Sequence, residues 1–147
     1  MHDVRAPRRS SQRRFSAIER HPPLLLGFLA VLDAALFTAI GAMHLGVSIG
    51  PYSAPQAPWV APLELFAAAS LAISAGAVWT RAGLAREIAI IGNGIALVSV
   101  FLGTVAFAAG IDPCTPITDI HYAMTAAVTF LSIWRLSRWQ RGLPWPP

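Results

Sequence analysis

Apolar side chains are gathered into four runs along the chain, at residues 24–49, 60–79, 88–111 and 119–136. A helix needs about 20 mostly apolar residues to cross the hydrocarbon core of a bilayer. The first three runs meet this length, whereas Arg135 interrupts the fourth. The pattern predicts an all-α fold, an integral membrane bundle of four transmembrane helices joined by short loops.

The fourth run contains the shortest uninterrupted apolar stretch, Ile120–Trp134. Arg135 and Arg138 follow it, and their long side chains can extend to the headgroup layer, so that the run still crosses. A re-entrant or interfacial helix is the alternative interpretation. Thr118 or Asp119 is expected to cap the N-terminus of this helix, because both residue types accept hydrogen bonds from free backbone N–H groups.

The two ends of the chain are polar. Residues 1–23 are rich in arginine and serine and are expected to form a disordered cytoplasmic tail, and residues 139–147 a second one. A basic tail before an apolar run is also typical of a signal peptide, but run 24–49 is longer than such a segment and no clear small-x-small cleavage site follows it. We therefore expect a retained helix, with an organellar transit peptide as the alternative for the tail.

Charge is scarce and one-sided. Charged residues make up 12% of the 147 residues and hydrophobic residues 55%, whereas soluble domains have about 25% charged residues. All 11 basic residues are arginines, and they lie before the first run, between the second and third, and after the fourth: Arg5, Arg8, Arg9, Arg13, Arg14, Arg20, Arg81, Arg86, Arg135, Arg138 and Arg141. With four crossings, both termini are cytoplasmic, and the protein is expected in a bacterial plasma membrane. Because topology explains the arginines, nucleic acid is not expected as a partner.

Three ionisable residues are expected at similar depth, near the outer ends of the first, second and fourth helices. They are His44, Glu64 and His121. Two imidazoles and a carboxylate are a ligand set for a divalent metal such as Zn²⁺, Cu²⁺ or Fe²⁺. Two other interpretations are open. One is structural: each histidine caps a helix end or bonds a loop carbonyl, and Glu64 pairs with one of them. The other is a proton or ion pathway.

Further polar residues recur at a spacing of eleven, which returns to nearly the same face of a helix. Such pairs occur in the first, third and fourth runs: Asp33 and His44, Asn93 and Thr104, His121 and Ser132. We expect these faces to point into the bundle, because ionisable groups in lipid are costly.

Asp33 is expected to hydrogen-bond Asn93 across the bundle. The alternative is a proton-carrying carboxyl in a small oligomeric transporter. Cys114 is the single cysteine of the chain and is expected to be a surface thiol, with a metal ligand or an intermolecular disulfide as alternatives.

The chain contains no Walker sequence, no Rossmann glycine pattern and no nucleophile elbow. The expected function is therefore that of a small non-enzymatic polytopic protein, an accessory or assembly subunit of a larger membrane complex. Its partners would be the lipid bilayer and other membrane subunits or further copies of itself. The alternatives are a metal- or ligand-binding protein that uses the outer histidines and Glu64, and the transporter that uses Asp33.

Overall fold

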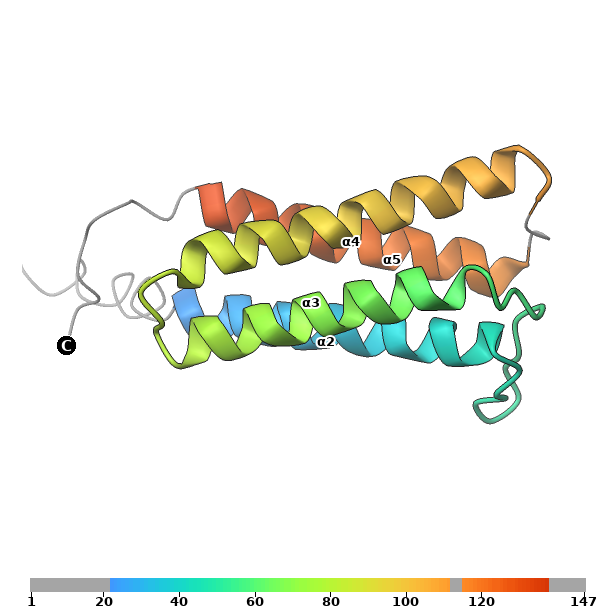
Figure 1. The fold of residues 1–147 in the computed structure, drawn as a ribbon, viewed down its shortest axis with the longest axis horizontal. Helices are drawn as coiled ribbons and strands as arrows, with labels where there is room; N and C mark the ends of the chain where they lie inside the picture. Colours follow the sequence, from blue (N-terminus) through green and yellow to red (C-terminus); the bar gives the residue numbers. More distant parts are fainter. Residues whose placement is uncertain (1–21, 112–114, 138–147) are drawn as a thin grey trace, which may run out of the picture.

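A computed structural model describes residues 22–111 and 115–137. These residues form four helices, α2 (Pro22–His44), α3 (Ala61–Trp79), α4 (Ala85–Ala108) and α5 (Pro116–Ser137). Successive helices run in opposite directions in one bundle (Figure 1), and each packs on two neighbours in the cyclic order α2, α3, α4, α5. The all-α prediction is confirmed for this part of the chain, where the only β pairing is an isolated bridge between Ile49 and Tyr52.

The bundle has two distinct ends. The loop end carries the α2–α3 loop, residues 45–60, and the connection from α4 to α5 (Figure 1). The arginine end carries Arg81, Arg86 and Arg135. The predicted tails, apart from residues 22 and 23, and Cys114 lie outside the described residues.

Two helices end earlier than hydropathy predicted, because a glycine stops each of them. The backbone of Gly46 has φ +92°, and after it the N–H of Val47 donates to the carbonyl of Ala42 at 3.0 Å. Gly110, with φ +69°, ends α4 in the same way, and the N–H of Ile111 donates to the carbonyl of Ala106 at 2.9 Å. Both are Schellman caps, which need a residue in the left-handed region that glycine adopts without strain. The predicted ends at 49 and 111 were therefore wrong by five and three residues.

The fourth helix begins before its predicted start. Thr115, and not Thr118 or Asp119, caps it: the Thr118 N–H donates to Thr115 Oγ1 at 3.3 Å, and the Thr115 N–H donates to Thr118 Oγ1 at 3.1 Å. This reciprocal pair satisfies two backbone donors, as in a capping box. The resulting helix has 22 residues and is about 33 Å long, enough to reach across a hydrocarbon core.

The inward faces repeat every seven residues. On α4, seven of the nine buried positions follow steps of four and three, with Asn93 and Val100 beside them: Ala85, Ala89, Gly92, Ala96, Ser99, Gly103 and Ala106. A repeat of 3.5 residues keeps one face of a helix turned toward its neighbours in a left-handed bundle. Most of these side chains are small, which brings the helix backbones close together, as is common in lipid.

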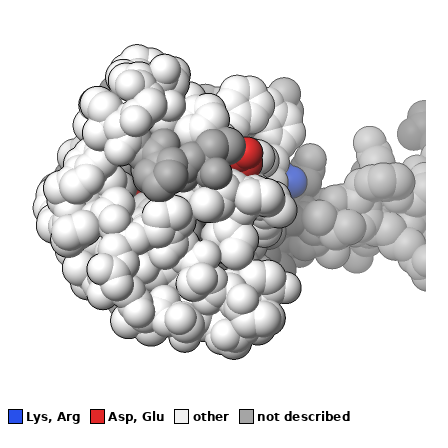
Figure 2. Space-filling view, turned by 90° about the vertical axis from the view of Figure 1, so that its right-hand side faces the viewer, with Lys and Arg blue, Asp and Glu red and all other residues white. Residues whose placement is uncertain are grey.

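The outward faces are apolar. Large hydrophobic side chains are exposed on every helix, among them Phe28, Phe66, Ile73, Phe101 and Phe130. Seen from the loop end, the surface is nearly free of charged residues (Figure 2). By length and composition, Leu24–His44, Ala61–Trp79 and Ala85–Ala108 are three candidate membrane spans among the described residues.

Candidate functional site

The polar pair nearest the loop end joins α2 to α3. Nδ1 of His44 lies 2.8 Å from Oε2 of Glu64, and the two residues are 0% and 2% exposed. His44 is in the last turn of α2 and Glu64 in the first turn of α3, where the helix dipoles favour a base and an acid respectively. The interpretation that Glu64 pairs with a histidine is supported by this contact.

The α2–α3 loop is anchored to the same place. The N–H of Ala57 donates to the carbonyl of His44 at 3.0 Å, and Ala57, Val60 and Ala61 are all buried. The backbone carbonyl at the end of α2 thereby gains a partner that the helix itself does not supply. The loop thus holds α2 and α3 together at the His44–Glu64 pair.

His121, on α5, packs against an aromatic ring. Its imidazole meets the Phe37 ring edge-on, with the ring centroids 5.4 Å apart and the planes at 86°. Nε2 of His121 is buried and has no hydrogen-bond partner within residues 22–111 and 115–137. In the same part of the chain, no three histidine, cysteine, aspartate or glutamate side chains are grouped so that they could hold a metal ion. The structure therefore brings His44 and Glu64 together but does not complete a three-ligand metal site with His121.

Asp33 pairs with a different residue from the one predicted. The hydroxyl of Thr129 on α5 donates to Oδ2 of Asp33 at 2.7 Å, and both residues are buried. Asn93 instead donates from Nδ2 to the carbonyl of Ala89, one turn earlier on its own helix, at 2.8 Å. The predicted Asp33–Asn93 hydrogen bond was therefore wrong, and sequence reasoning missed Thr129. A signal was available: Thr129 follows Thr125 by four residues on the predicted polar face of the fourth helix.

The predicted inward face of α4 is only half correct. Asn93 is buried, but Thr104 is exposed, and its hydroxyl donates to the carbonyl of Val100 at 2.8 Å. Eleven residues bring an isolated helix back to within about 20° of the same face. In a bundle with a 3.5-residue repeat, two residues that are eleven apart differ by about 50° around the helix axis. This rotation places Thr104 beyond the edge of the buried face.

A hydrophobic layer separates His44 and Glu64 from Asp33. It consists of buried side chains from α2, α3 and α4: Ala34, Phe37, Ala67, Ala68, Leu71, Ala96 and Val100. At this depth α5 contributes Thr125, whose hydroxyl donates to the carbonyl of His121 at 2.9 Å and so is satisfied within its own helix. Ser99, beside Val100, is satisfied in the same way by the carbonyl of Ile95. The other buried polar residues form two groups, one at the loop end and one in the middle of the bundle.

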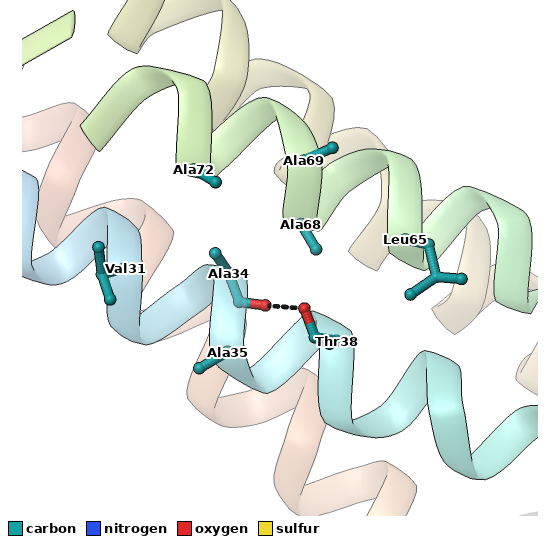
Figure 3. A pocket seen from close by; sticks show the side chains of 8 residues that line it. All are labelled: Val31, Ala34, Ala35, Thr38, Leu65, Ala68, Ala69 and Ala72. Carbon is teal, nitrogen blue, oxygen red and sulfur yellow. Dashed lines mark hydrogen bonds between the residues drawn. The ribbon is translucent and has the colours of Figure 1, made fainter. Parts of the chain in front are cut away.

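An apolar groove lies on the outside of the bundle, between α2 and α3 (Figure 3). It is lined mostly by small side chains: Val31, Ala34, Ala35, Thr38, Leu65, Ala68, Ala69 and Ala72. The one hydroxyl in it belongs to Thr38, which donates to the carbonyl of Ala34 at 2.8 Å. The groove therefore presents an apolar surface to whatever packs against it.

The fold and composition define a class of protein. Three helices with the length and composition of membrane spans are typical of a multi-pass helical membrane protein. Comparisons with family models, with curated proteins and with solved structures gave no match.

Proposed function

We propose that this chain is a small non-enzymatic protein with four membrane spans that acts as an accessory or assembly subunit of a larger complex in a bacterial plasma membrane. The groove between α2 and α3 carries this proposal, and its occupant is a transmembrane helix of a partner protein. Small side chains at a helix surface allow backbones to approach closely, which is how helices associate in lipid.

The shape of the groove supports helix docking. Ala35, Ala69 and Ala72 are exposed and leave the α2 and α3 backbones accessible along the groove, whereas other outward positions carry large side chains such as Phe66 and Ile73. A partner helix seated there gains dispersion contacts over several turns without displacing a polar group. The small residues of the second run thus serve both the inside of the bundle and its outer surface.

The distribution of polar and apolar residues on α5 supports the proposal of four crossings. Its polar residues His121, Thr125, Thr129 and Ser132 are buried in the bundle, whereas Phe130 on the opposite face is exposed. Mean hydropathy adds both faces together and so understates how apolar the lipid-facing side is. This supports α5 as a fourth span although it does not meet the composition criterion that the other three helices meet.

The interface anchors support an orientation with both termini in the cytoplasm. Arg81, Arg86 and Arg135 gather at one end, where Trp79 and Trp134 are exposed. The guanidinium of Arg135 lies over the Trp134 ring, 5.4 Å from its centroid. Tryptophan marks the headgroup layer, and arginine favours the cytoplasmic side.

Cysteine labelling tests this orientation. In a Cys114→Ser background, a membrane-impermeant maleimide should label Tyr52→Cys in intact cells. The same reagent should label Arg81→Cys and Ser137→Cys only after permeabilisation. Labelling of Ser137→Cys in intact cells would mean that α5 does not cross.

Co-purification tests the groove. The tagged full-length protein is extracted in mild detergent and its stoichiometric partner is identified by mass spectrometry. Ala72→Leu fills the groove with a larger side chain and should reduce recovery of that partner by about tenfold, the equivalent of about 1.4 kcal/mol. Ala127→Leu is the matched control, because Ala127 is exposed on α5 and does not line the groove.

The outcomes are distinct. Loss of the partner in Ala72→Leu, with retention in Ala127→Leu, supports the proposal. A partner retained equally in both variants refutes the groove as the docking surface. A wild-type protein that purifies alone, as a monomer or as a homo-oligomer, refutes the accessory function.

A further inference from the structure

Three buried oxygen atoms in the middle of the bundle are not used by the fold. They are Oδ1 of Asp33, Oδ1 of Asn93 and the hydroxyl of Ser132, and none has a hydrogen-bond partner among the described residues. The three residues are 1%, 3% and 2% exposed. A buried polar atom without a partner is costly, and native structures contain few of them. Three from three different helices therefore need a common explanation.

Residue counting along the helices places Asp33, Asn93 and Ser132 at similar depth. Leu26, Val78, Ala89 and Leu136, one residue from each helix, form a buried cluster toward the arginine end. Asn93 and Ser132 each lie four residues inward of this cluster, and Asp33 lies seven residues inward. At 1.5 Å per residue, the three side chains begin within about 4.5 Å of one another along the bundle axis.

The hydrogen bonds around the cluster keep the free oxygens available. Asn93 donates its Nδ2 to the carbonyl of Ala89, which leaves Oδ1 as an acceptor. Thr129 donates to Oδ2 of Asp33 and so holds the carboxyl in one orientation, with Oδ1 on its other side. Ser132 lies three residues after Thr129 and is buried like it, so α5 presents two hydroxyls to the same region. The two hydrogen bonds fix the orientation of the Asp33 and Asn93 side chains. Neither provides a hydrogen-bond donor to Oδ1 of Asp33 or to Oδ1 of Asn93.

Carboxylate, amide and hydroxyl oxygens are ligands for hard cations, and a bound cation is one way to stabilise a buried carboxylate. The site has a single carboxyl group, because Glu64 lies beyond the hydrophobic layer that contains Phe37 and Leu71. A monovalent cation would neutralise Asp33, whereas a divalent cation would leave an excess positive charge in the membrane interior. Ionisable residues within a span commonly mark ion sites for this reason.

We propose that Asp33, Asn93 and Ser132 bind a monovalent alkali cation, sodium, in the middle of the bundle. Asp33 supplies the charged ligand, Asn93 and Ser132 supply neutral oxygens, and Thr129 is a positioning residue. The bound ion joins α2, α4 and α5 at one point. The site is independent of the groove between α2 and α3.

Sodium binding is measured on the full-length protein in mild detergent. Equilibrium dialysis with radioactive sodium should give about one ion per chain, and Tm should rise with sodium concentration but not with choline chloride at the same ionic strength, because only the folded bundle assembles the ligands. Asp33→Asn should abolish both effects. Ser132→Ala should raise the half-saturating sodium concentration by about tenfold, as the loss of one ligand oxygen predicts.

Two variants serve as controls. Glu64→Gln removes the other buried carboxyl group and should leave sodium retention unchanged. Asp119→Asn removes an exposed carboxyl group and should also leave sodium retention unchanged. Size-exclusion chromatography checks that each variant is folded. If Asp33→Asn does not fold, the sodium affinity of Ser132→Ala is the test of the site.

Two results overturn the proposal. The first is a wild-type protein that retains no sodium and has the same Tm in both salts. If the Tm of this protein then changes with pH alone, the carboxyl group of Asp33 holds only a proton. The second is equal sodium retention by the wild type and a folded Asp33→Asn variant.

Discussion

The His44–Glu64 contact leads to a quantitative prediction about coupling between two helices. Both side chains are buried, and 2.8 Å separates Nδ1 of His44 from Oε2 of Glu64. A hydrogen bond that involves an ionisable group contributes about 1.5–3 kcal/mol, and removal of one partner leaves the other buried without it. We therefore expect His44→Ala and Glu64→Ala each to lower the free energy of unfolding by about 3 kcal/mol or more, since each also opens a cavity.

The double variant separates the contact from the cavities. The cavity costs add, but the hydrogen bond is lost only once, so His44→Ala/Glu64→Ala should be more stable than the sum of the two single changes predicts. We expect a coupling energy of about 1.5–3 kcal/mol. The assay is reversible unfolding in mixed detergent micelles, followed by tryptophan fluorescence for all four proteins of the cycle. Additivity within about 0.5 kcal/mol would refute the reasoning, because residues that do not interact behave in that way.

Three further predictions use the same unfolding assay. Gly46→Ala should lower the free energy of unfolding by about 1–2 kcal/mol, because position 46 has φ +92°. Gly94→Ala, within α4, should raise it by up to about 1 kcal/mol, because a Cβ there meets nothing within 4 Å. Equal effects of the two substitutions would contradict the Schellman cap at Gly46. Thr115→Ala should lose about 1 kcal/mol as the N-cap of α5 is removed, and no loss would argue against the reciprocal Thr115–Thr118 cap. Thr129→Val keeps the side-chain volume but removes the hydroxyl that donates to Asp33, so the free energy of unfolding should fall by about 1 kcal/mol. An unchanged free energy of unfolding would mean that this hydrogen bond contributes nothing to stability.

Helix number could be predicted from the sequence, but helix ends could not. Apolar runs report which segments tolerate lipid, and they predicted a helix in each of the four places where the structure has one. Val47 and Ile49 are as apolar as the helix before them, so hydropathy continued the first helix past its true end. The signal that stops it is backbone conformation at Gly46, which a hydropathy scale does not record.

The site was predictable in its residue types and not in its pairings. Burial of Asp33, His44, Glu64 and His121 follows from the cost of ionisable groups in lipid, and all four are buried. The partner of Asp33, however, lies 96 residues away on α5. Which side chains meet depends on the relative register and tilt of two helices, and a single sequence without alignment does not contain that information.

The layer around Phe37 has a consequence for the membrane itself. Asp33 and His44 are eleven residues apart on α2, a distance of about 16 Å along the helix, and Phe37, Leu71 and Val100 occupy the interval. The hydroxyls of Ser99 and Thr125 at this depth donate to carbonyls of their own helices, so a water molecule or ion from the loop end would cross a largely apolar segment. In the four-span arrangement proposed above, this segment would hinder the passage of water and ions through a single bundle.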